Sequence, residues 1–179
     1  GQHHTMVSDM KSDDSENIYG RLAVECSGIR EEDWANNWKQ YFKPFCIGKK
    51  LLIKPSWENC ENPENRTVLE IDPASSFGTG QHHTTRLCLE LLEKSLCRGD
   101  KILDLGCGSG ILSIGAMLLG AESAVAVDIE ENAVQTAIEN AEKNHINSEK
   151  YTAYCGNIIS DKELSEKIEG SYDIITANI

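Results

Sequence analysis

Short β-forming runs alternate with stretches of helical periodicity from residue 101 onward, and this alternation is the strongest constraint on the fold. It predicts an α/β fold, in which parallel strands are joined by right-handed helical crossovers. The expected strands span residues 101–105, 123–128, 150–154 and 172–177. The expected helices end at residue 119, span 130–144 and lie near 161–168. In such a sheet a ligand binds at the carboxyl ends of the strands, so we seek candidate site residues there.

The segment after the first of these strands carries the clearest ligand-binding pattern. Residues 104–110, with the sequence DLGCGSG, lead from the strand into its helix and place three glycines where the backbone must turn sharply. In a dinucleotide-binding loop the third glycine comes three residues after the second. That position is Ile111 here, because Gly110 follows Gly108 by only two residues. The spacing favours a loop for S-adenosyl-L-methionine over one for a nicotinamide cofactor.

Polar residues end the later strands. Asp128 lies 22 residues beyond Gly106, and its acceptor-only carboxylate suits the two hydroxyls of a ribose. The same carboxylate can also cap the following helix, and the two roles are compatible. Asn178 follows the fourth strand, and its amide can accept from an amine while donating to a cofactor, although it could equally be a turn residue. Residues 155–158 give a weaker signal for contact with adenine.

The region before the alternation predicts a helix and a small β-hairpin. Aromatic residues recur at helical spacing around residues 31–42, and Pro44 ends the pattern. Two apolar runs, 51–54 and 67–71, flank a turn-rich segment and suggest an antiparallel pair.

Composition excludes several other classes of protein. The chain has 179 residues, 40% of them hydrophobic, which suits one domain with a short extension. Its longest mostly apolar run, 111–121, is well short of the roughly 20 residues that span a membrane. A net charge of −12 argues against a nucleic-acid surface. The seven cysteines contain no C-x-x-C pair, so we expect no metal site, and without a secretory signal we expect a cytoplasmic protein.

Several segments together resemble one family, and the resemblance covers roughly residues 20–179. These segments have the sequences FGTGQHHTT at 77–85, DLGCGSG at 104–110 and ANI at 177–179, together with the aromatic stretch at 32–44 and IKPSW at 53–57. They are similar to PrmA, the bacterial methyltransferase family that modifies ribosomal large-subunit protein eleven. One departure is His83, where we expect proline in the family.

The resemblance implies a Rossmann-like class I methyltransferase sheet with helices on both faces. It implies S-adenosyl-L-methionine as cofactor and a ribosomal large-subunit protein as substrate, methylated on lysine side chains and the amino terminus. The cofactor-binding residues that it implies are Thr85, Gly106, Gly108, Asp128 and Asn178. It identifies no catalytic residue.

The resemblance also predicts a domain organisation. Residues 1–28 would be a remnant of an amino-terminal substrate-recognition domain, 29–66 a linker helix and the start of the next domain, and 67–179 a cofactor domain truncated after its fourth strand. We expect a monomer at full length. Two alternatives stay open: a cofactor-binding fragment without activity, and an NAD-dependent oxidoreductase.

Overall fold

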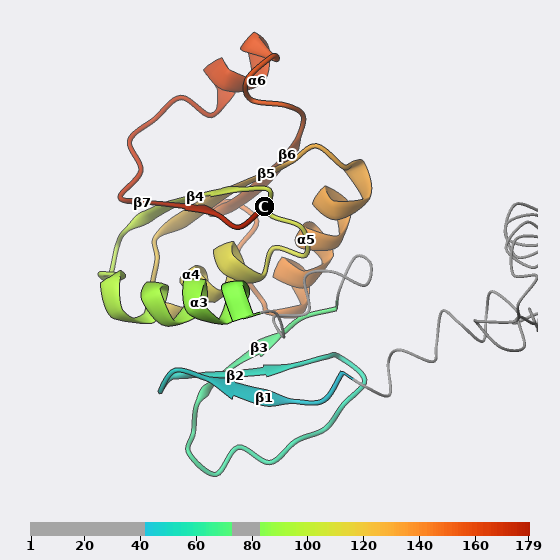
Figure 1. Ribbon diagram of the computed structural model, residues 1–179, viewed down its shortest axis with the longest axis vertical. Helices are drawn as coiled ribbons and strands as arrows, with labels where there is room; N and C mark the ends of the chain where they lie inside the picture. Colours follow the sequence, from blue (N-terminus) through green and yellow to red (C-terminus); the bar gives the residue numbers. More distant parts are fainter. Residues whose placement is uncertain (1–41, 73–82) are drawn as a thin grey trace, which may run out of the picture. The chain divides into compact units, whose positions relative to one another are not determined.

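The computed structural model describes residues 42–72 and 83–179, shown in colour in Figure 1. The chain divides into two units, Gly1–Asn37 and Trp38–Ile179, and every described residue belongs to the second. Most of the expected aromatic helix and residues 77–82 of the family-like segment lie outside the described residues. In the part that is described, no helix is long and apolar enough to cross a membrane.

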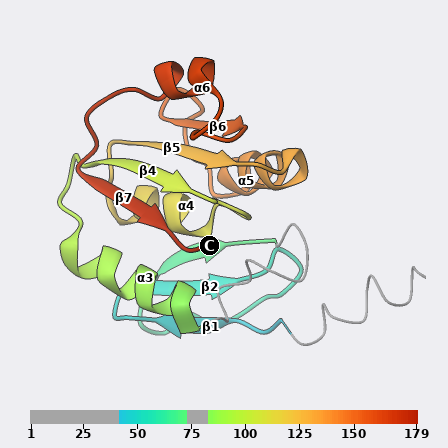
Figure 2. The same ribbon diagram turned by 45° about the horizontal axis from the view of Figure 1, so that its top comes forward.

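A four-stranded parallel sheet forms the centre of the fold. Its strands lie in the order β6-β5-β4-β7 (Figure 2) and have the bounds Lys101–Leu105 (β4), Ser123–Asp128 (β5), Tyr151–Cys155 (β6) and Ile174–Ala177 (β7). All three pairings are parallel. The chain adds β5 and β6 on one side of β4 and then returns to add β7 on the other. Strand order thus reverses at β4, and the predicted α/β sheet is confirmed.

Helices cover both faces of this sheet, as predicted. They have the bounds His83–Ser95 (α3), Ile111–Leu119 (α4), Glu131–Lys143 (α5) and Lys162–Lys167 (α6). Gly120 ends α4 in a left-handed conformation, with φ of +118°. The Asp161 side chain caps α6 by accepting a hydrogen bond from the Leu164 backbone N–H. We did not predict α3, although its buried residues, Thr85, Leu89 and Leu92, have helical spacing.

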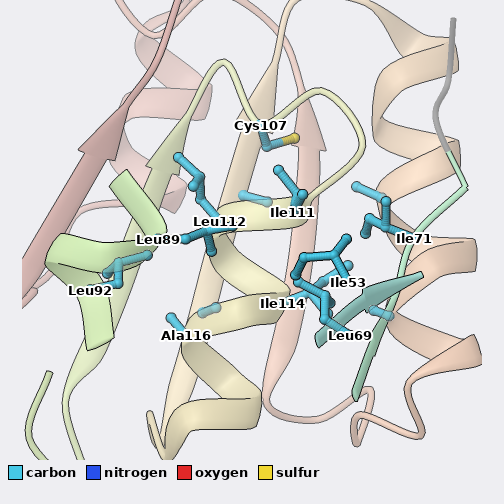
Figure 3. Close-up of a cluster of buried hydrophobic side chains, with 14 of the residues drawn as sticks. Ile53, Leu69, Ile71, Leu89, Leu92, Cys107, Ile111, Leu112, Ile114 and Ala116 are labelled. Carbon is cyan, nitrogen blue, oxygen red and sulfur yellow. The ribbon is translucent and has the colours of Figure 1, made fainter. Parts of the chain in front are cut away.

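The larger core lies around α4, which is mostly apolar and largely buried. Side chains of α4, such as Ile114, pack with Leu89 of α3 and Leu69 of β3 (Figure 3). On the opposite face of the sheet, Leu103 and Val127 pack against α6 in a smaller cluster. That face is not covered along its whole width, because Ile175 of β7 is 60% exposed.

A three-stranded sheet packs against α4 through the same core. Its strands are Phe45–Ile47 (β1), Leu51–Lys54 (β2) and Thr67–Glu70 (β3). The predicted antiparallel pairing of 51–54 with 67–71 is wrong, because β2 and β3 are parallel. The turn-rich segment between them crosses back before β3 begins. The antiparallel partner of β2 is β1, across a tight turn that contains Gly48 with φ of +54°.

Phe42 also differs from the prediction. It was expected on the aromatic helix, but it lies just before β1, outside any helix or strand, and is 2% exposed. Its ring centroid lies 6.4 Å from that of Phe45 and 6.2 Å from that of Trp57. These distances are typical of aromatic pairs in a core.

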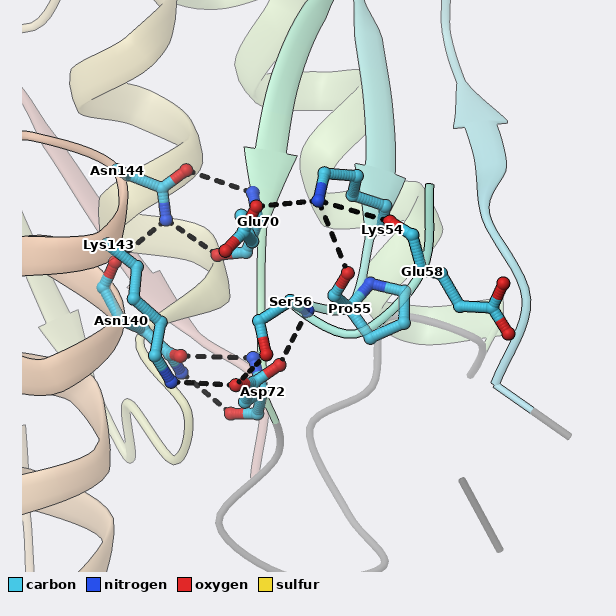
Figure 4. Close-up of polar contacts among 9 residues, drawn as sticks. All are labelled: Lys54, Pro55, Ser56, Glu58, Glu70, Asp72, Asn140, Lys143 and Asn144. Carbon is cyan, nitrogen blue, oxygen red and sulfur yellow. Dashed lines mark hydrogen bonds and ion pairs between the residues drawn. The ribbon is translucent and has the colours of Figure 1, made fainter. Parts of the chain in front are cut away.

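Asp72, which follows β3, joins this sheet to α5 through its carboxylate (Figure 4). Lys143 of α5 pairs with it at 2.7 Å, and Ser56 donates to it through its backbone N–H and its hydroxyl. Partial burial opposes ionisation, but the hydrogen bonds from Lys143 and Ser56 outweigh it and lower the pKa of Asp72.

Leu69→Ala tests how the small sheet is attached. Leu69 is fully buried, so its truncation should lower the free energy of unfolding by about 2–5 kcal/mol. Val68, its neighbour, is 37% exposed, and Val68→Ala should cost about 1 kcal/mol or less. Urea denaturation measures both values. Equal costs would contradict the packing described here.

The lowered pKa of Asp72 predicts a pH dependence of stability. A carboxyl group with a lowered pKa stabilises the fold above its unfolded pKa, and that contribution is lost as pH falls through the folded value. The free energy of unfolding should therefore drop below about pH 4, and Asp72→Asn should reduce that drop. Urea denaturation of both proteins at a series of pH values measures the difference. Parallel curves would show that Asp72 does not contribute.

Candidate functional site

The candidate site lies where β4, β5 and β7 end. The loop after β4 carries Gly106 and Gly108, Asp128 ends β5, and Asn178 directly follows β7. Thr85, from the first turn of α3, contacts Asn178. All five predicted cofactor-binding residues are therefore described, and the fold brings them to the same edge of the sheet.

Backbone hydrogen bonds hold the loop after β4 against the end of β5. The N–H groups of Gly106 and Cys107 donate to the Val127 carbonyl oxygen at 2.8 and 3.1 Å. Gly106 and Gly108 adopt φ of +69° and +54°, a region that side chains disfavour. A Cβ atom on Gly106 would lie 3.0 Å from Ile179, whereas one on Gly108 would meet no atom of the described residues within 4 Å. The Gly108 side of the loop is thus open to a ligand.

Gly110 lies on the packed side of the loop, away from the open side at Gly108. Its φ is +78°, and a Cβ atom there would lie 2.8 Å from the Tyr151 hydroxyl and 3.0 Å from Ile114. Beneath it, the Ser113 hydroxyl donates to the Gly110 carbonyl oxygen at 3.1 Å and lies 3.1 Å from the Tyr151 hydroxyl. The close approach of loop, α4 and β6 therefore requires glycine at this position.

The Asp128 carboxylate accepts hydrogen bonds from two backbone N–H groups. Gly108 donates to Oδ2 at 2.8 Å and Glu130 donates to Oδ1 at 3.0 Å. The carboxylate thus fixes the loop after β4 and the turn that leads into α5. Because two carboxylate oxygens offer about four acceptor positions, further donors such as hydroxyl groups can still be accommodated.

Asn178 and Thr85 lie 93 residues apart in the sequence and form a direct hydrogen bond. Asn178 Nδ2 donates to Thr85 Oγ1 at 3.0 Å, and Thr85 is 5% exposed. Because the Asn178 amide nitrogen is directed toward Thr85, its oxygen points away from it. A carboxamide held in this way presents a fixed, uncharged acceptor at the edge of the sheet.

Asp104 is a buried polar residue to which we assigned no role from the sequence. It is 1% exposed, accepts from the Thr176 hydroxyl at 2.7 Å, and accepts from the Ser113 backbone N–H at 3.1 Å. Burial raises its pKa, although the hydrogen bonds from Thr176 and Ser113 act in the opposite direction. Asp104 joins β4, β7 and the start of α4, and so holds the edge together from beneath.

Ile129 is a second residue that we did not single out. It follows Asp128 directly, and its side chain is 72% exposed. The end of β6 lies beside it, because Gly156 N–H donates to the Asp128 carbonyl oxygen at 2.9 Å and the Cys155 thiol lies 3.6 Å from the Ile129 carbonyl oxygen. In the sequence, the signal that could have pointed to Ile129 is an apolar residue directly after the strand-end carboxylate of Asp128.

Two further polar groups at the ends of the strands, Asn157 and the Cys107 thiol, have contacts within the protein. Asn157, in the stretch 155–158 for which contact with adenine was predicted, accepts from the Ile159 backbone N–H at 3.0 Å within a turn. The contact with adenine stays a prediction. Burial, then the charges of Asp104 and Asp128, raise the pKa of the Cys107 thiol and favour its protonated form. Among residues 42–72 and 83–179, no three His, Cys, Asp or Glu side chains form a cluster suited to a metal ion.

Known proteins are similar to this chain in sequence and in fold. The family model described as "Ribosomal protein L11 methyltransferase (PrmA)" matches residues 2–179. Proteins of that name from Thermoanaerobacter pseudethanolicus and Lachnoclostridium phytofermentans are 44% and 43% identical to it. Each match covers 89% of this chain, but only 49% and 52% of the relative. The chain thus spans about half the length of these relatives.

A solved structure supports the same relationship. The ribosomal protein L11 methylase from Lactobacillus delbrueckii subsp. bulgaricus is 31% identical, with a TM-score of 0.65. The match covers 76% of this chain and 66% of that protein. Sequence and fold therefore agree, and the chain belongs to the ribosomal protein L11 methyltransferase (PrmA) family.

Proposed function

We propose that the edge formed by β4, β5 and β7 binds S-adenosyl-L-methionine and serves an N-methyltransferase. The observation that carries this proposal is the hydrogen bond between Asn178 and Thr85 at the same edge as Asp128. A fixed amide acceptor, a strand-end carboxylate and an open glycine loop are the groups that an amine substrate and a nucleoside cofactor require.

The residues of this edge fit the parts of the cofactor. Asp128 has acceptor positions for the ribose hydroxyls, in addition to the two backbone N–H groups that it already binds. The open side of Gly108 allows close approach of the ligand to the backbone. The exposed side chain of Ile129 offers an apolar surface beside the carboxylate, which suits the face of a purine.

The chain's own groups need only orient the acceptor and exclude water. When bound, S-adenosyl-L-methionine supplies a methyl group that is already activated for transfer. An attacking amine must be neutral, and for a lysine with a pKa of about 10.4, deprotonation near pH 7.4 costs roughly 4 kcal/mol. Desolvation in the site lowers that pKa. Asn178 can accept a hydrogen bond from the amine and align it, so no covalent intermediate is required.

The proposed acceptor is ribosomal protein L11, methylated on lysine side chains and the amino terminus. Membership of the family and the names of the relatives support this choice. Activity, substrate and partner are proposed for the whole protein. The aligned region covers only 49% of the Thermoanaerobacter pseudethanolicus relative. A ribosomal substrate places the proposed activity in the cytoplasm.

Asp128→Ala tests the cofactor site. Loss of the carboxylate should weaken binding of S-adenosylhomocysteine by about 1.5–3 kcal/mol, the range for a hydrogen bond to a charged group. Isothermal titration calorimetry measures the affinity, and Glu130→Ala, two residues away, is the control that should bind as the wild type does. An unchanged affinity in Asp128→Ala would show that the carboxylate does not hold the ribose.

Transfer of a labelled methyl group tests the activity. Wild-type chain incubated with methyl-labelled S-adenosyl-L-methionine and ribosomal protein L11 should incorporate label into L11. Because Asn178 is proposed to orient the amine, Asn178→Ala should reduce the initial rate by about tenfold or more. Mass spectrometry of L11 locates the methyl groups. Cofactor binding without any transfer would instead support a cofactor-binding chain that is inactive by itself.

A further inference from the structure

Asn140 of α5 and Asn144, which caps the end of that helix, bind the backbone of β3 and of the residues that follow it (Figure 4). Asn144 Oδ1 accepts from the Glu70 N–H at 2.9 Å, and its Nδ2 donates to the Glu70 carbonyl oxygen at 2.6 Å. Asn140 makes the same pair of contacts with Asp72, at 3.0 and 2.7 Å. Each carboxamide thus pairs with one residue as a neighbouring strand would.

Helix and strand spacing explain why the pair fits. Residues four apart in a helix are separated by about 6 Å along its axis, and alternate residues of a strand by about 6.6 Å. Alternate residues of β3 also direct their backbone groups to opposite sides. Thr67 and Ile71 N–H groups donate to β2 and its preceding turn, whereas Glu70 and Asp72 face the asparagines. The two amides therefore cover the edge of β3 that lies away from β2.

The second N–H of each amide distinguishes the two asparagines. In Asn144 it donates to the Asn140 carbonyl oxygen, 2.7 Å away in the last turn of α5. In Asn140 it donates to the Ser109 carbonyl oxygen, 2.9 Å away in the loop after β4. Ser109 lies between Gly108 and Gly110. Of these two asparagines, Asn140 therefore connects α5 and the segment after β3 with the loop that is proposed to bind the cofactor.

We propose that Asn140 is a positioning residue that fixes the conformation of this loop for cofactor binding. The role rests on the proposed function, because Asn140 acts on the ligand only through the backbone of Ser109. Asn140 is fully buried, so its three hydrogen bonds cannot easily be exchanged for water. Aspartate would lack both donors, and glutamine is longer by one methylene group. Asparagine alone matches the distance and the donor pattern.

Amide hydrogen exchange of the ligand-free chain tests the structural step. Asn140→Ala should accelerate exchange of the Gly108 and Gly110 N–H groups by about tenfold, the factor that corresponds to about 1.4 kcal/mol. Asn144→Ala is the matched control, because it also removes contacts with β3 but leaves the hydrogen bond to Ser109. Exchange in the loop should be unchanged in the control. Equal acceleration in both variants, or in neither, would overturn the proposal.

Titration with S-adenosylhomocysteine tests the functional step. Asn140→Ala should bind at least about fivefold more weakly than wild type, whereas Asn144→Ala should stay within about twofold. Urea denaturation of both variants shows whether their losses of stability are comparable. If the affinities change equally at comparable stability, Asn140 is only structural, and the proposal is wrong.

A failure of this proposal differs from a failure of the proposed function. If wild-type chain binds no S-adenosylhomocysteine, the proposed function is contradicted, while hydrogen exchange still decides whether Asn140 orders the loop. If Asn140→Ala does not fold, Asn140→Ser replaces it in both experiments. Serine leaves room for water but cannot reach Asp72 and Ser109 together, so the same changes are expected, and wild-type values would overturn the proposal.

Discussion

The attachment of the β4–α4 loop to the end of β5 is the interaction on which the candidate site depends. Gly106 and Cys107 donate to the Val127 carbonyl oxygen, and Gly108 donates to the Asp128 carboxylate. The same carboxylate thus orders the loop and stands beside its open face. Neighbouring parallel strands end at one edge of the sheet, which is why a short loop after β4 can reach the end of β5.

Support for this edge comes from polar groups buried beneath it and beside it. Asp104 connects β4 to Thr176 of β7, which directs the chain toward Asn178. Asn140 connects the loop to the small sheet through Ser109 and Asp72. The apolar residues of α4 hold both sheets in one core. The segment after the three-stranded sheet is thus connected to the loop of the candidate site through Asn140.

The sequence predicted the parts of the fold that local patterns determine. The bounds of β4 and β5 agree with the prediction, because each is a short β-forming run next to a turn or a glycine. The direction of β3 was predicted wrongly, since parallel and antiparallel strands share the same alternation and differ only in the path of the connecting chain. The α3 helix was missed because its first turn was taken as part of a loop motif.

The sequence indicated candidate site residues at the ends of strands, but it did not indicate buried residues that act through distant partners. Asp128 and Asn178 could be recognised as polar residues at strand ends. The role of Asp104 depends on Thr176, 72 residues away, and that of Asn140 on Asp72, 68 residues away. Neither partner can be identified from a local pattern. Long-range hydrogen bonds of this kind require the structure.

Calorimetric titration of the chain with S-adenosylhomocysteine, with NADH as control, tests the central claim most directly. The glycine spacing, the Asp128 carboxylate and the contact between Asn178 and Thr85 predict micromolar binding of S-adenosylhomocysteine and no binding of NADH. Binding of NADH alone, or of neither ligand, would contradict the assignment of this edge as a methyltransferase cofactor site.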